Sequence, residues 1–220
     1  MRTSTVIKAI LAASAAMPLL CHAESTFNSS GTSPSAASAH VDFQITIPKF
    51  IFLRVGNGTG VVNASGVFTT APATNAVVDQ ITWAPAANVV GNGTAIAGTG
   101  GDLTGGVETA ILVANNGTVT LTATTVGALQ NAPAAPFDTI SYSTITTTAS
   151  HNNTALTLPA PALADAATTT VTLTPVAPSK VIYQDAKWAY TWANNVVPAP
   201  GVYGGVNTQN SRVTYTASVP

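Results

Sequence analysis

The chain has 220 residues, and only 7% of them are charged, against about 25% in an average soluble protein. Its formal net charge is -1, so it lacks the basic surface that binding to nucleic acid requires. Apolar residues make up 46% of the chain, which excludes the composition of a disordered protein and provides enough apolar material for one buried core.

The N-terminus has the pattern of a Sec-type signal peptide. Arg2 and Lys8 supply positive charge before the apolar run Ala9–Leu20, and Cys21 and Ala23 are small residues at a typical cleavage site. We therefore predict cleavage after Ala23 and export to the periplasm, the cell surface or the medium. The apolar run is too short for a transmembrane helix, which needs about 20 apolar residues. The alternative is a lipoprotein signal, with Cys21 as the lipid-bearing residue.

Cys21 is the only cysteine, so the mature chain is predicted to have no disulfide, no thiolate metal site and no cysteine nucleophile. Residues 24–39 are rich in Ser and Ala and contain too little apolar surface to fold, which predicts a flexible leader. Residues 40–220 are then expected to form a single β-sandwich domain.

A strand pattern starts at His40, where apolar residues alternate with polar ones. The apolar members are Val41, Phe43, Ile45 and Ile47. Pro48 marks an edge or a kink, because proline cannot donate to a strand ladder. The run Phe50–Val55 follows; it is apolar on both faces and is typical of a strand at the centre of a sandwich.

The rest of the chain repeats short β-branched runs between Gly, Asn and Pro residues. Further strands are expected in 61–70, 77–83, 108–114, 118–125, 139–148, 168–174, 180–192 and 212–219. Asn115-Asn116-Gly117 predicts a hairpin between its two neighbouring runs, and the Gly-rich stretch Gly91–Gly106 predicts a mobile connection or a bulged turn. Ala160–Ala167 is the one plausible helical turn. We predict an all-β fold, an antiparallel β-sandwich of Ig-like or Greek-key type with about 8–10 short strands.

No motif indicates catalysis, a metal site or a cofactor. His40 and His151 stand apart from each other and from clustered carboxylates, unlike the ligands of a zinc site. The glycine cluster at Gly98–Asp102 lacks the lysine of a phosphate-binding loop and the acidic ligands of a calcium loop. No Gly-x-Ser-x-Gly elbow with triad partners is present. We therefore predict a protein that is not an enzyme.

Three aromatic residues share one strand face, because they are spaced two apart: Trp188, Tyr190 and Trp192. The favoured interpretation places this face in the core, where large aromatic side chains usually pack. In the alternative they form an exposed platform for stacking on sugars, and the protein is a soluble, secreted module that binds carbohydrate or a surface.

Two resemblances involve particular residues. The segment 200–203 (PGVY), followed by 213–220 (VTYTASVP), resembles the closing strands of secreted bacterial surface β-sandwiches, including WxL-type proteins. The signal peptide, Ser/Ala leader, alternating strand, Thr/Val/Gly-rich body and C-terminal strand with Tyr215 are similar to the organisation of chaperone–usher fimbrial subunits.

The fimbrial resemblance implies a surface structural protein that assembles by strand complementation. One copy would offer Val41, Phe43, Ile45 and Ile47 to the groove of a neighbour. Its partners would be further copies, other surface subunits and a periplasmic chaperone. In a closed monomer the same four side chains would instead form the first strand of the chain's own core.

Overall fold

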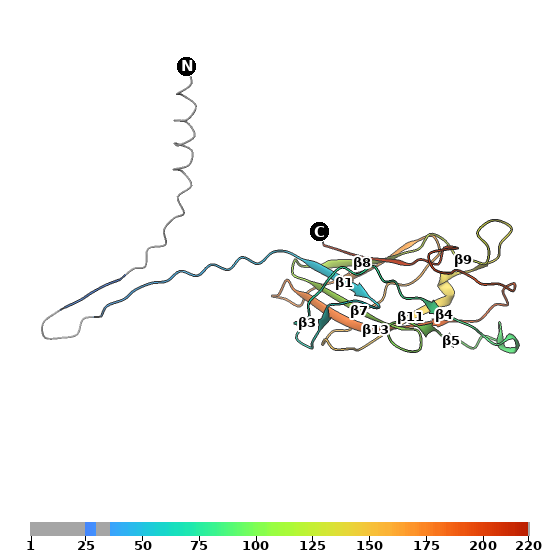
Figure 1. Cartoon of the computed structure of the whole chain (residues 1–220), viewed down its shortest axis with the longest axis horizontal. Helices are drawn as coiled ribbons and strands as arrows, with labels where there is room; N and C mark the ends of the chain where they lie inside the picture. The colour runs from blue at the N-terminus through green and yellow to red at the C-terminus, as the bar shows by residue number, and fades with distance from the viewer. Residues whose placement is uncertain (1–24, 30–35, 220) are drawn as a thin grey trace, which may run out of the picture. The chain divides into compact units, whose positions relative to one another are not determined.

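The structure is a computed structural model that describes residues 25–29 and 36–219. The predicted signal peptide, residues 1–23, lies outside the described residues, as does its cleavage site. The chain divides into two units, which meet between Ile47 and Pro48. Every strand of the described residues belongs to the second unit, which is called the body below (Figure 1).

The body is built from two main sheets, and their strand pairs are antiparallel. The first sheet has the order β1 (Ile51–Val55), β7 (Val107–Ala114), β13 (Ile182–Trp192) and β11 (Ile145–Ser150), and β5 (Ile96–Ala97) also pairs with β13. The second sheet has the order β12 (Thr168–Leu173), β8 (Val119–Thr124) and β14 (Thr214–Ser218).

Three short strand pairs and two short 3-10 helices complete the described body. The pairs are β2 (Val61–Val62) with β3 (Phe68–Thr70), β4 (Ile81–Thr82) with β6 (Thr99–Gly100), and β9 (Leu129–Gln130) with β10 (Thr139–Ile140). The 3-10 helices are η2 (Ala87–Val89) and η3 (Tyr142–Thr144). The all-β prediction is confirmed, whereas the Ig-like or Greek-key type stays a prediction.

The two main sheets share one hydrophobic core, because alternate residues of their strands face each other. β7 contributes Ala110, Leu112 and Ala114, and β8 contributes Val119 and Leu121. β13 adds its three aromatic residues to the same core. Burial alternates along β8 and along the aromatic half of β13, whereas β7 is buried on both of its faces.

The predicted hairpin around Gly117 is wrong in its pairing. β7 and β8 are consecutive and joined by a tight turn, but β7 pairs with β1 and β13, and β8 pairs with β12 and β14. The physical reason is that both strands have an apolar face that must be buried, and placing them in different sheets lets both faces share one core. Gly117 has a φ of 96°, which suits the turn between the sheets.

Two further expectations are corrected. Ala160–Ala167 contains no helix; Pro161 and Leu163 are buried, and the carbonyl of Ala164 accepts a hydrogen bond from the Thr125 hydroxyl. The run Phe50–Val55 is predicted to lie at the centre of a sandwich, but β1 is an edge strand, with β7 as its one strand partner among the described residues. Its second apolar face is covered by the small pair β2–β3 instead of by a second sheet.

The number of strands was also underestimated. The described residues contain fourteen strands, of which seven have only two or three residues. Such short pairs arise where loops touch, so they leave little pattern in the sequence.

Candidate functional site

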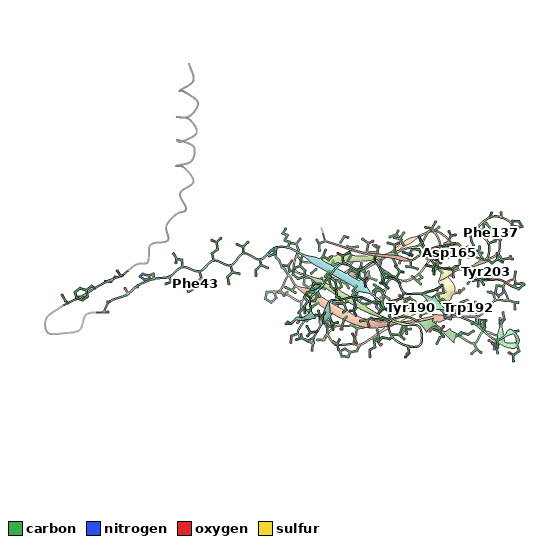
Figure 2. The ribbon with its side chains drawn as sticks, viewed as in Figure 1. Phe43, Phe137, Asp165, Tyr190, Trp192 and Tyr203 are labelled. Atoms are coloured by element: carbon green, nitrogen blue, oxygen red, sulfur yellow. The ribbon has the colours of Figure 1, made fainter. Side chains whose placement is uncertain are left out.

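The segment 40–47 contains the four predicted assembly residues, and the structure places all four on the surface. Val41, Phe43, Ile45 and Ile47 are 73%, 89%, 85% and 74% exposed. The segment forms no strand, and Figure 2 shows the Phe43 side chain standing on an extended stretch of chain. None of the four side chains is therefore buried or part of a strand in this structure.

The sequence around Pro48 disfavours the tightest hairpin between segment 40–47 and β1. A two-residue hairpin over Pro48-Lys49 would need a positive φ at proline, whose ring fixes φ near -65°. A three-residue loop that began at Ile47 would put this residue in a helical conformation, which a following proline disfavours. Residues 48–50 form no turn in the structure.

β1 has one edge that no other strand covers in the described part of the chain. Its backbone groups on that side are not taken up by a ladder, and such an edge is a template for pairing with an added strand. On the core side of β1, Leu53 and Val55 pack against the main core but stay only partly buried. On the outer side, Phe52 packs against a small cluster with Ile111.

The core is also incompletely covered at β14, the last strand of the chain. Val213, Tyr215, Ala217 and Val219 pack against the core and are only partly buried. Facing residues of the central strands β7 and β8 are fully buried by comparison, with Leu112 and Leu121 at 0% exposed. β14 contacts β1, so the two strands with half-covered apolar faces adjoin.

A groove of about 670 Å³ follows β1. All five residues of β1 line it, so the groove follows the strand edge and not a single face. Residues 57–59 and 72–75 also line the groove, with Val77. Residues 71–80 form no strand and therefore leave the edge of β1 without a ladder partner.

Arg54 is the charged residue of this groove, and its guanidinium is half-buried. Its Nη1 atom donates to the carbonyl oxygens of Gly58 (3.0 Å) and Gly60 (3.5 Å). Its Nε atom is buried and has no hydrogen-bond partner among the described residues. Burial lowers the pKa of Arg54, while Asp102 and Asp185 act in the opposite direction. The groove therefore contains a cation with hydrogen-bonding capacity left over.

A pair of carboxyl groups fixes segment 71–80 next to the turn after β1. Asp79 accepts hydrogen bonds from the backbone N–H and the side-chain amide of Asn57, both at 2.6 Å. Burial raises the pKa of Glu108 to about 8, and the nearby carboxylates of Asp79 and Asp102 add to the shift. Glu108 is therefore mostly protonated at neutral pH and can share its proton with Asp79, its hydrogen-bonding neighbour.

The predicted aromatic face lies in the core, as the favoured interpretation had it. Trp188, Tyr190 and Trp192 are 0%, 7% and 5% exposed. Trp188 donates from its indole nitrogen to the carbonyl of Leu158 at 2.9 Å, and the hydroxyls of Tyr190 and Tyr215 are 3.0 Å apart. Figure 2 shows Tyr190 and Trp192 within the body. These side chains are not available in this structure to stack on a sugar.

The described residues contain no group of three His, Cys, Asp or Glu side chains that could hold a metal ion. Within the same residues, no helix has the length and apolar character needed to cross a membrane. Asp185 is the most buried acid, and its carboxylate accepts hydrogen bonds from the backbone of Asn153 and Thr154. It holds the loop over the outer face of β13.

Sequence reasoning missed three residues of this site: Arg54, Asp79 and Glu108. Arg54 interrupts an otherwise apolar run, and Glu108 has the same parity as the core residues Ala110 and Leu112, so both signals were visible. Asp79 left no signal, because its role depends on a loop contact. No protein-family model, curated protein or solved structure matches the chain.

Proposed function

We propose that this chain is an exported surface structural protein without enzymatic activity, and that it assembles by strand complementation as a fimbrial-type subunit. The proposal rests on the combination of two features in one chain. Segment 40–47 exposes four alternating apolar side chains, and β1 has a strand edge that no other described strand covers, next to a partly exposed part of the core. In complementation, segment 40–47 of one copy adds to the edge of β1 in another copy.

The burial of apolar surface favours the addition of segment 40–47 to β1 of another copy. Burying one Val, Ile or Phe side chain stabilises a complex by about 1.5–3 kcal/mol, so four contribute about 6–12 kcal/mol before the cost of association. The added strand also pairs its backbone with the free groups of β1, which is the source of affinity in strand addition. Because the edge and the segment lie on the same chain, identical copies can join head to tail.

Export and partners follow from the same proposal. The predicted signal peptide directs the chain to the periplasm, from which it reaches the cell surface or the medium. An uncovered strand edge and exposed apolar side chains promote aggregation. A periplasmic chaperone that covers both until assembly is therefore the expected partner, together with further copies or other surface subunits.

Deletion of residues 24–47 tests the function. The core lies in the body, so the truncated chain is expected to stay folded, to lose assembly in size-exclusion chromatography, and to bind a synthetic peptide of residues 36–47. The mature full-length chain is expected to elute as a ladder of oligomers or as filaments. A strictly monomeric mature chain, or a folded truncated chain that does not bind the peptide, contradicts strand complementation.

A further inference from the structure

We propose that Arg54 of one copy binds Asp42 of the neighbouring copy, and that this ion pair sets the register of the complementing strand. The inference rests on the proposed function, because it needs segment 40–47 of a second copy beside β1. It goes further by naming the polar contact that selects one register among those that the apolar residues alone allow.

In the copy that receives the added strand, the position of Arg54 on β1 determines what it can bind. On β1 the core-facing residues are Leu53 and Val55, so Arg54 faces the opposite, outer side together with Phe52. The guanidinium lines the groove and retains a buried nitrogen without a partner in the described part of the chain. A half-buried guanidinium gains most from a carboxylate, which can accept two parallel hydrogen bonds from it.

In the copy that supplies the added strand, the alternation of segment 40–47 determines where Asp42 projects. Asp42 lies between Val41 and Phe43, so it projects from the opposite face of an extended strand. It is exposed, and it is the only acidic residue from 36 to 47. When Val41 and Phe43 face the core of the neighbour, Asp42 faces the same outer side as Arg54.

Register follows from this parity. Side chains that lie directly opposite each other on paired strands project from the same face. Pairing Asp42 with Arg54 therefore puts Val41 and Phe43 on the core side, next to Leu53 and Val55. A slip by one residue would bury Asp42 against the core and expose the apolar face, and a slip by two would leave the carboxylate opposite an apolar residue.

The occupant is a second copy and not the same chain. A two-residue turn over Pro48-Lys49, which would return the segment onto its own β1, needs a positive φ that proline cannot adopt. In the structure, residues 41–47 form no strand. Pairing between copies needs no such turn.

Charge reversal tests the pair in the full-length mature chain. Asp42→Arg puts two cations together, and Arg54→Asp puts two anions together. Each variant alone is expected to assemble about ten-fold or more weakly, as for other desolvated interfacial ion pairs. Assembly is measured by light scattering and size-exclusion chromatography. Lys187→Asp is the control, because Lys187 is an exposed cation of β13 on the same outer face.

Mixing the two reversed variants is the experiment that distinguishes an ion pair between copies from other causes of lost assembly. In the mixture, a copy with Asp42→Arg can add its segment to a copy with Arg54→Asp, and the reverse is also possible. Every contact between unlike copies then joins one cation and one anion, so assembly should recover. This recovery also shows that the Arg54→Asp body is folded. A pair formed within one chain would not be restored by mixing.

The outcomes separate the two claims. If the wild-type chain never assembles, the proposed function fails and the ion pair falls with it. If the wild-type chain assembles and both reversed variants assemble equally well, only the ion pair is overturned. Loss in both variants without recovery in the mixture also overturns the pair.

Discussion

Two segments of this protein alternate apolar and polar residues in the same way and end in opposite environments. In β13, Trp188, Tyr190 and Trp192 are at most 7% exposed, whereas in segment 40–47 the apolar side chains are at least 73% exposed. β13 pairs with strands on both of its sides, and its aromatic face is covered by the second sheet. Segment 40–47 pairs with no strand.

Alternation of apolar and polar residues therefore identifies a strand face that must be buried, but it does not identify the residues that bury it. For β13 the cover is in the same chain and includes β14, whose Tyr215 ring lies 5.2 Å from that of Trp188. For segment 40–47 the four apolar side chains are exposed, and the proposed cover is a second copy. Stability measurements can test this contrast directly.

The largest effect is expected at the centre of β13. Trp188→Ala removes a fully buried indole and leaves the carbonyl of Leu158 without its donor. Deleting a large buried aromatic side chain usually costs about 3–5 kcal/mol. Urea unfolding of the variant should show a loss of this size. A loss below about 1 kcal/mol would contradict the assignment of this residue to the core.

The next effect concerns the turn that follows β1. Gly56 has a φ of 80°, and a Cβ atom there would lie 2.2 Å from a carboxylate oxygen of Asp79 and 2.6 Å from one of Glu108. Gly56→Ala is therefore expected to cost about 2–3 kcal/mol, from backbone strain and from displacement of the two carboxyl groups. Denaturant unfolding measures the loss.

Gly117→Ala is the matched control for this variant. Gly117 also has a positive φ, but a Cβ atom there would meet nothing within 4 Å. It should lose only the backbone contribution, about 1 kcal/mol. Equal losses at the two positions would show that the carboxyl pair does not constrain the turn.

A smaller effect of opposite sign is expected at Glu108. Its folded-state pKa of about 8 lies above the value of 4.5 expected for the unfolded chain, so the folded state binds the proton more tightly. The stability contributed by this proton is complete below about pH 4.5 and is lost as the pH rises through 8. Glu108→Gln keeps a donor for Asp79 without a titrating group.

The variant should therefore be more stable than the wild type at pH 8 and nearly equal to it at pH 4.5. Thermal unfolding of both proteins across this pH range measures the difference. Parallel pH profiles for the two proteins would show that Glu108 is not the group responsible.

Much of the fold could be predicted from the sequence, because most long strands leave a period-two signal. The predicted runs over 180–192 and 212–219 contain β13 (Ile182–Trp192) and β14 (Thr214–Ser218). Which strands pair could not be predicted: the Asn-Gly signal at Gly117 specifies a turn but not whether the chain stays in one sheet. The same limit explains why the edge position of β1 could not be predicted from its apolar run.

The site was predicted only in its apolar part. The four assembly residues follow from alternation, but the groove that would receive a strand is formed by residues 50–55, 57–59 and 72–75, with Val77. Its polar residues depend on these contacts. Arg54 and Glu108 were visible as charges in apolar runs, whereas the interaction of Asp79 with Asn57 spans 22 residues of chain and has no local pattern.

The smallest effect on folding stability is expected in segment 40–47, where the contrast with β13 is sharpest. Phe43 is 89% exposed, so Phe43→Ala removes no buried contact from the monomer. Its free energy of unfolding, measured on the monomeric fraction at low protein concentration, should change by less than about 0.5 kcal/mol. The same variant should nevertheless assemble much more weakly, since Phe43 is the largest of the four side chains that would enter the neighbour's core. Gln44→Ala, on the polar face of the same segment, should leave both quantities close to those of the wild type. A large loss of monomer stability in Phe43→Ala would mean that segment 40–47 packs within its own chain in solution, and the contrast between the two segments would then disappear.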